Sequence, residues 1–152
     1  MQILPFLCAL VAASVGLTEP ELAKALRGDV PVRSETITAP SGKASGRGVG
    51  AIVIDRPLEE VWQTVIRYED KAEYQPRVDK VWVLEKQPNY IKVRMQVDAS
   101  VTTARYTAHF ELNPDQHSVH WRLDKTAPDN TIADCDGSYQ LTEVTPTRTL
   151  VV

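Results

Sequence analysis

The chain has few of the residues that build metal clusters and disulfide frameworks. Its 152 residues include two cysteines and three histidines, so at most one internal disulfide can form and no dense metal cluster is indicated. It also lacks an excess of positive charge, because 17 Lys and Arg stand against 20 Asp and Glu. A net charge of −3 gives no field that would collect nucleic acid. We therefore expect no nucleic-acid partner, no metal and no cofactor.

The remaining composition is that of an ordinary globular protein. Hydrophobic residues make up 43% of the chain and charged residues 24%, which argues against disorder, collagen and coiled coil. The length corresponds to about one domain. Composition alone names no function.

An apolar run near the start, Ile3 to Val15, is too short to cross a bilayer comfortably, which takes about 20 residues. The small residues of Ser14-Val15-Gly16 suit a signal peptidase. We predict a signal peptide over residues 1–16 and a secreted or periplasmic protein. Met1-Gln2 carries no positive charge, so a membrane-associated or buried helix stays the alternative.

A short helix and an arm are predicted next, over residues 17–45. Thr18 can cap a helix and Glu21 can complete a capping box, while Gly28 stops the helix. From Pro31 to Gly50 the chain is rich in Ser, Gly, Pro and Thr, which indicates a hairpin or a flexible arm. The main domain is assigned to residues 46–152.

The main domain opens with a strand that turns into a helix. Gly50 to Asp55 is a short β-branched run, and from Pro57 the apolar period changes from two to about 3.6. Residues 68–74 predict a second helical turn, which Pro76 ends. Two short helices are therefore expected after the first strand.

From residue 78 onward the pattern is that of strands separated by turn signals, which predicts an antiparallel meander. The predicted strands are Val78–Leu84, Tyr90–Val97, Thr102–Leu112, Ser118–Leu123, Thr131–Leu141 and Arg148–Val152.

These strands alternate apolar and polar residues, so one face of the sheet is apolar. In residues 91–98, for example, Ile91, Val93 and Met95 alternate with lysine, arginine and glutamine. An apolar sheet face must be covered, yet the predicted helices are short. Either the sheet encloses a hydrophobic cavity, or a helix from outside this sequence covers it.

Two segments carry a family resemblance. Ile52 to Pro76 resembles the opening of the START/Bet v 1-like (SRPBCC) superfamily, in its polyketide cyclase/dehydrase and coenzyme Q-binding START-domain branch. Gly137-Ser138-Tyr139-Gln140-Leu141 is similar to a signature late in that family's sheet. The resemblance covers roughly Gly46 to Val152. It implies an α+β helix-grip fold, in which a curved antiparallel sheet grips a long C-terminal helix and holds a hydrophobic ligand.

The sequence departs from that family at one point. It stops at Val152 within a predicted strand, so the family's C-terminal helix is missing from it. We expect either a truncated sequence or a partner that supplies the cover.

The resemblance shifts the interpretation of the inner residues from plain core to the lining of a cavity for a lipid, an isoprenoid quinone or a polyketide. The candidate ligand-binding residues are Val93, Met95, Tyr106, Ala108, Phe110, Val119, Trp121, Cys135, Tyr139, Leu141 and Arg148. Arg148 is expected near the rim, where it could meet an acidic or carbonyl head.

No catalytic residue is assigned. The inner positions offer Tyr106, Tyr139 and Cys135 as proton donors but no inward His, Asp or Glu, whereas acid–base chemistry needs a tuned pair. His117 and His120 lie three apart, which on a strand points them to opposite faces. A cyclase or aromatase-like enzyme and an interaction module completed by a partner helix remain alternatives. Transient membrane contact and the oligomeric state are left open.

Overall fold

The computed structural model of the chain describes residues 16–42 and 44–152. Apart from Gly16, the predicted signal peptide lies outside this range. No helix in the described residues is long and apolar enough to span a membrane.

The chain divides into two compact units. The first, called here the N/C unit, combines the described residues up to Leu58 with residues 141–152. The second, the central unit, runs from Glu59 to Gln140.

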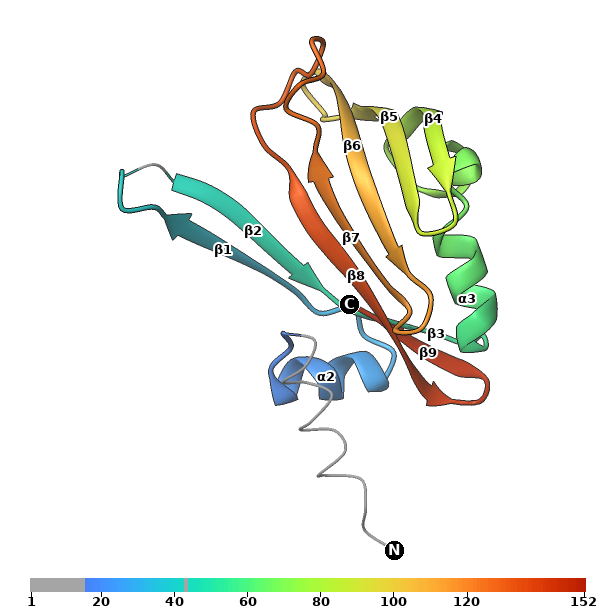
Figure 1. Ribbon diagram of the computed structural model, residues 1–152. Helices are drawn as coiled ribbons and strands as arrows, with labels where there is room; N and C mark the ends of the chain where they lie inside the picture. The colour runs from blue at the N-terminus through green and yellow to red at the C-terminus, as the bar shows by residue number, and fades with distance from the viewer. Residues whose placement is uncertain (1–15, 43) are drawn as a thin grey trace, which may run out of the picture. The chain divides into compact units, whose positions relative to one another are not determined.

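Most strands form one antiparallel sheet, in the hydrogen-bonded order β3-β9-β8-β7-β6-β5-β4, and β1 and β2 pair as a hairpin of their own (Figure 1). Elements of the N/C unit are α2 (Glu19–Leu26), β1 (Val32–Thr38), β2 (Ala44–Gly50), β3 (Ile52–Ile54) and β9 (Arg148–Val151). Helical elements at the start of the central unit are α3 (Leu58–Val65), the 3-10 helix η1 (Tyr68–Asp70) and α4 (Lys71–Tyr74). Its strands are β4 (Val78–Gln87), β5 (Tyr90–Asp98), β6 (Thr103–Asn113) and β7 (Ser118–Leu123), and β8 (Asp136–Thr145) belongs to both units.

The N-terminal helix begins where the sequence predicts it. The Glu21 amide donates to the Thr18 hydroxyl at 3.3 Å, and the Thr18 amide donates to the Glu21 carboxylate at 2.8 Å, which is the predicted capping box. Gly28, just past the helix, has a φ of +96°, a conformation that glycine adopts without strain. Within the N/C unit, α2 contributes Leu22 and Ala25 to a small core with Leu17, Ala51 and Leu150.

The predicted arm is a two-stranded antiparallel hairpin. Its register runs from Val32 opposite Gly50 to Thr38 opposite Ala44. Nearly all of its residues are exposed.

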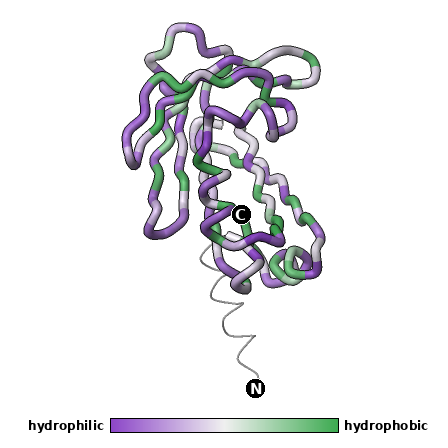
Figure 2. The backbone as a smooth tube through the Cα atoms, turned by 90° about the vertical axis from the view of Figure 1, so that its right-hand side faces the viewer, coloured by the Kyte–Doolittle hydropathy of each residue, from purple (hydrophilic) through white to green (hydrophobic). Residues whose placement is uncertain are grey.

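The central sheet confirms the predicted alternation. Val93, Ala108 and Val119 come from three different strands, and each is 0% exposed. Intervening polar residues lie on the other face, so colours alternate along the tube in Figure 2. Helix α3 is amphipathic in the predicted way, since it buries Val61 and Trp62.

One predicted strand is displaced. The segment Thr131–Leu141 was expected to be extended, but β8 begins at Asp136 and continues to Thr145. Polar side chains explain the late start: the Arg105 amide donates to the Thr131 hydroxyl at 2.9 Å, and the Thr107 amide donates to the Asn130 side-chain oxygen at 3.0 Å. Such side-chain acceptors compete with ladder formation, so Cys135 precedes the strand instead of lying within it.

Candidate ligand-binding site

The inner face of the central sheet is defined by residues paired directly across neighbouring strands. Such partners point to the same side of an antiparallel sheet. Val93 lies opposite Ala108, Phe110 opposite Trp121, and Val119 opposite Tyr139. The predicted residues of β5, β6, β7 and β8 in this unit therefore share one face.

Four rings cross this face in continuous contact, and we call them the aromatic row: Tyr68, Phe110, Trp121 and Tyr139. Successive ring centroids are 4.4, 6.0 and 4.9 Å apart, within the range of favourable aromatic pairs. Tyr68 and Phe110 are buried, whereas Trp121 and Tyr139 are half-buried. The row thus has a buried end and an end that solvent can reach.

Gly137 makes room for one ring of the row. A Cβ at this position would lie 2.2 Å from Cζ2 of Trp121, so only glycine lets the indole lie across β8. This close approach gives a physical role to the glycine of the Gly-Ser-Tyr-Gln-Leu segment.

The predicted proton donors on this face stay protonated at neutral pH. Burial raises the pKa of Tyr106 to about 12, and its hydroxyl lies 3.8 Å from Met95 Sδ. Burial, reinforced by Asp136 and Asp134, also raises the pKa of the free Cys135 thiol. Neither group is an activated nucleophile or base.

Sequence reasoning missed a buried lysine next to the row. Lys71 in α4 is 4% exposed, and its Nζ lies 4.4 Å from the ring centroid of Tyr68 and 5.9 Å from that of Tyr139. Tyr74 contributes a third ring at 5.8 Å. Burial lowers the pKa of Lys71 to about 8. The spacing of Tyr68, Lys71 and Tyr74, three residues apart each time, places them on one side of a helical turn, and this was the available signal.

The sequence analysis also did not assign Tyr68 to this site. It is 0% exposed, and its hydroxyl has no hydrogen-bond partner in the described structure. Burial raises its pKa, so the phenol stays protonated and is a buried hydrogen-bond donor without an acceptor.

Two predicted residues belong to the other unit. Leu141 is buried, and Arg148 is half-buried in the N/C unit. The Arg148 Nε donates to the Asp55 carboxylate at 3.0 Å, and its Nη2 donates to the Leu26 carbonyl at 3.4 Å. The guanidinium therefore has partners within its own unit.

The outer face of the central sheet carries a polar cluster. The Asp124 carboxylate accepts hydrogen bonds from the Thr126 hydroxyl at 2.6 Å and amide at 2.9 Å, and Lys92 Nζ lies 3.2 Å away. These contacts lower the pKa of Asp124 to about 2, and the hydrogen bonds from Thr126 contribute most to the shift. His109 lies 3.5 Å from the same carboxylate and 2.5 Å from the Tyr90 hydroxyl, so its imidazole is not available to the inner face.

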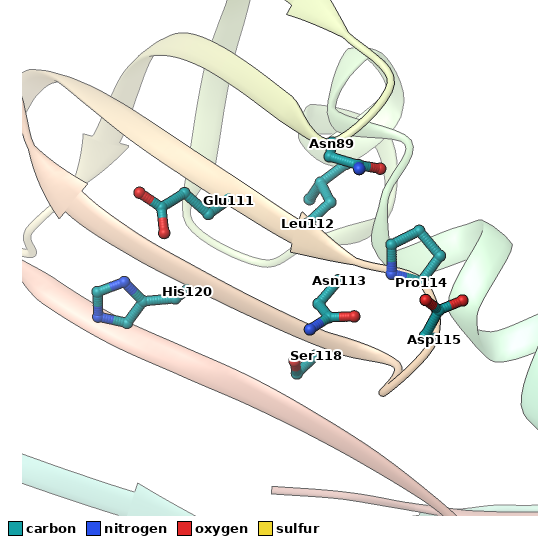
Figure 3. Close-up of a pocket in the computed structure, with 8 residues that line it drawn as sticks. All are labelled: Asn89, Glu111, Leu112, Asn113, Pro114, Asp115, Ser118 and His120. Atoms are coloured by element: carbon teal, nitrogen blue, oxygen red, sulfur yellow. The ribbon is translucent and has the colours of Figure 1, made fainter.

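A pocket of about 430 Å³ lies at the β6–β7 turn (Figure 3). It is lined by Asn89, Glu111, Leu112, Asn113, Pro114, Asp115, Ser118 and His120. None of these belongs to the predicted lining. His120 lies here, whereas His117 contacts Trp62 with ring centroids 5.5 Å apart, so the two histidines do not share a site.

The antiparallel sheet and the short helices after its first strand have the α+β helix-grip fold of solved START/Bet v 1-like structures. Residues 54–151 match the family described as polyketide cyclase / dehydrase and lipid transport. The chain belongs to this family. No curated protein sequence matches it significantly.

Solved structures with the same fold include enzymes and lipid-transfer proteins. The Zhui aromatase/cyclase from Streptomyces sp. R1128 is 21% identical, with a TM-score of 0.61, over 80% of this chain and 64% of that one. A STAR-related lipid transfer protein from Xanthomonas axonopodis is 10% identical, with a TM-score of 0.64, over 81% and 73%. A START superfamily protein from Mycobacterium smegmatis is 12% identical, with a TM-score of 0.56, over 79% and 71%. The chain thus spans about two thirds of the Zhui structure, and these likenesses confirm the predicted fold.

Proposed function

We propose that the chain binds or carries a hydrophobic small molecule, such as a lipid, an isoprenoid quinone or a polyketide, against the inner face of the central unit. The aromatic row supports this most directly. A row that served only as core would be closed at both ends, but Trp121 and Tyr139 remain half-buried. Large aromatic surface left accessible on an apolar face is typical of ligand sites.

The energetics of burial fit this role. Each methylene removed from water contributes about 0.8 kcal/mol, so a tail that buries about ten of them contributes roughly the free energy of a micromolar complex. Association itself costs several kcal/mol. Contacts with the aromatic row offset part of that cost, and no precisely placed charge is needed for the tail to bind.

Lipid extraction tests the proposal. The full chain is incubated with mixed-lipid vesicles, separated from them, and its bound species are identified by mass spectrometry. We expect Trp121→Ala to lower the bound fraction about tenfold, because it removes one of the two accessible rings of the row. Trp82→Ala is the matched control, since Trp82 is 41% exposed on β4 and its ring faces Arg94.

The opposite result is equally clear. A folded chain that is purified empty and takes up no lipid, quinone or polyketide contradicts the proposal. Release of ligand only in the presence of vesicles would indicate transient membrane contact.

An aromatase or cyclase-like enzyme is the second candidate. Lys71 and Tyr68 favour it, because they add two proton-bearing groups to a face that otherwise has few groups for proton transfer. Turnover of an aromatic polyketide analogue that is lost in Lys71→Met would support this candidate. No turnover by the unmodified chain would contradict this candidate, and unchanged turnover in Lys71→Met would contradict the role of Lys71 in it.

Secretion or a periplasmic location remains our proposal from residues 1–16. It is tested by N-terminal sequencing of the exported protein, which we expect to begin at Leu17. Retention of Met1 on a cytosolic product would contradict it.

A further inference from the structure

Lys71 is a buried cation without an anion. In the described part of the chain its Nζ makes no hydrogen bond and no ion pair, and its neighbours are the rings of Tyr68, Tyr74 and Tyr139. Rings attract a cation, but they do not replace the water or carboxylate that a buried ammonium normally has. The site therefore holds uncompensated positive charge.

The three rings around Lys71 offer no compensating charge. Tyr68 comes from η1, Tyr74 from α4 itself and Tyr139 from β8. Burial raises the pKa of each of these phenols, so all three are neutral at physiological pH. Lys71, whose pKa is lowered to about 8, is still mostly protonated at pH 7.

Tyr68, next to Lys71, is a second buried donor without an acceptor. Its ring is the one nearest to the Lys71 ammonium, and its buried hydroxyl lacks an acceptor. A fully buried donor without a partner is uncommon in native proteins. An ammonium and a hydroxyl that both lack an acceptor call for the same ligand group, an oxygen with negative charge.

We propose that Lys71 and Tyr68 bind the oxyanion head of an amphiphilic ligand whose tail lies along the aromatic row. This inference rests on the proposed function and narrows its ligand class to molecules that end in a carboxylate or an enolate. The row continues from Tyr68 through Phe110 to Trp121, so a head held at Lys71 is followed directly by apolar surface. Among the three rings around Lys71, that of Tyr74 is the most exposed, because the residue is 44% exposed.

The experiment compares two probes with the same twelve-carbon tail, dodecanoate and dodecanol. Their affinities for the full chain are measured by calorimetry at pH 7, below the concentrations at which either probe aggregates. We expect dodecanoate to bind about tenfold more tightly, which corresponds to one charge-assisted hydrogen bond. Lys71→Met removes this preference but retains dodecanol binding, and Lys71→Arg restores part of the preference.

Two further measurements separate a head-group role from a structural one. Tyr68→Phe is expected to lower dodecanoate affinity severalfold with little effect on dodecanol. Lys80→Met is the matched control, because Lys80 is exposed on β4. In the unmodified chain the preference is expected to decline from pH 7 to pH 10, as Lys71 loses its proton, so the test holds even if a variant does not fold.

The outcomes distinguish this inference from the proposed function. Equal binding of both probes, unchanged by Lys71→Met and by pH, overturns the head-group site and leaves hydrophobic binding intact. Binding of neither probe, together with no uptake of lipid, quinone or polyketide, overturns both.

Discussion

At the scale of single residues, Lys71 makes the chain less stable than its apolar variant. A buried charge without a partner is unfavourable, and a pKa lowered from 10.5 to about 8 corresponds to about 3 kcal/mol against the charged form, a cost that an apolar side chain of similar length does not have. We therefore expect Lys71→Met to raise the free energy of unfolding at pH 7. Urea denaturation measures it, and a variant that is less stable at pH 7 contradicts the prediction.

The same residue predicts a pH dependence. The pKa of Lys71 is about 8 in the folded chain, whereas the ordinary value of 10.5 applies to the unfolded chain. Between these values the unfolded state binds more protons, so stability contributed by this group rises with pH from 8 to 10.5. Lys71→Met is expected to lack that rise, whereas Lys80→Met keeps it.

Packing tightly constrains the identity of the residue at position 137. Gly137→Ala places a methyl group against the Trp121 indole, and such overpacking typically costs about 1–3 kcal/mol. We expect this loss in urea denaturation. Gly46→Ala is the control, because nothing lies within 4 Å of a Cβ at that position. In a Trp121→Leu background the cost should shrink, and an undiminished cost would show that Trp121 is not the cause.

At the scale of elements, the sequence was most informative where burial alternates regularly. Strands β5, β6 and β7 were predicted nearly to the residue because one face of each is apolar and the other polar. The start of β8 was missed because Asn130 and Thr131 bond to the backbone of β6, and a propensity argument does not anticipate such long-range acceptors. Lys71 was missed because lysine is almost never buried without a partner.

The connection between β7 and β8 depends on Asp124, and this predicts an acid-sensitive element. The pKa of Asp124 is lowered from 3.8 to about 2. Its contribution to stability is therefore complete above pH 3.8 and is lost as the pH falls from 3.8 to about 2. Asp124→Asn is expected to flatten the stability profile in that window, as measured by urea denaturation at several pH values. Asp134→Asn is the exposed control, and equal profiles for both variants would contradict this role.

At the scale of the whole molecule, the meander order and the inner face followed from the sequence, whereas the partners of isolated charges did not. The alternation of inward and outward residues along one strand predicts that Arg148 lies near the rim of a ligand site. Its observed partner, Asp55, is 93 residues away in sequence, and a contact of that separation leaves no trace in local periodicity. Two cations are therefore candidates for binding the head of a ligand. The sequence pattern suggested Arg148, in the N/C unit, and the structure suggests Lys71, in the central unit.

These two cations differ in what already surrounds them, and this decides which of them should recognise the head. Arg148 has the Asp55 carboxylate and the Leu26 carbonyl as acceptors, whereas Lys71 has three neutral rings. We expect Arg148→Met to leave the preference for dodecanoate over dodecanol unchanged within a factor of about two and to cost under about 1 kcal/mol of stability, because Asp55 is exposed. Calorimetry of Arg148→Met beside Lys71→Met makes the comparison directly. If the preference disappears with Arg148 and persists without Lys71, the head is recognised by Arg148, as the strand pattern first indicated.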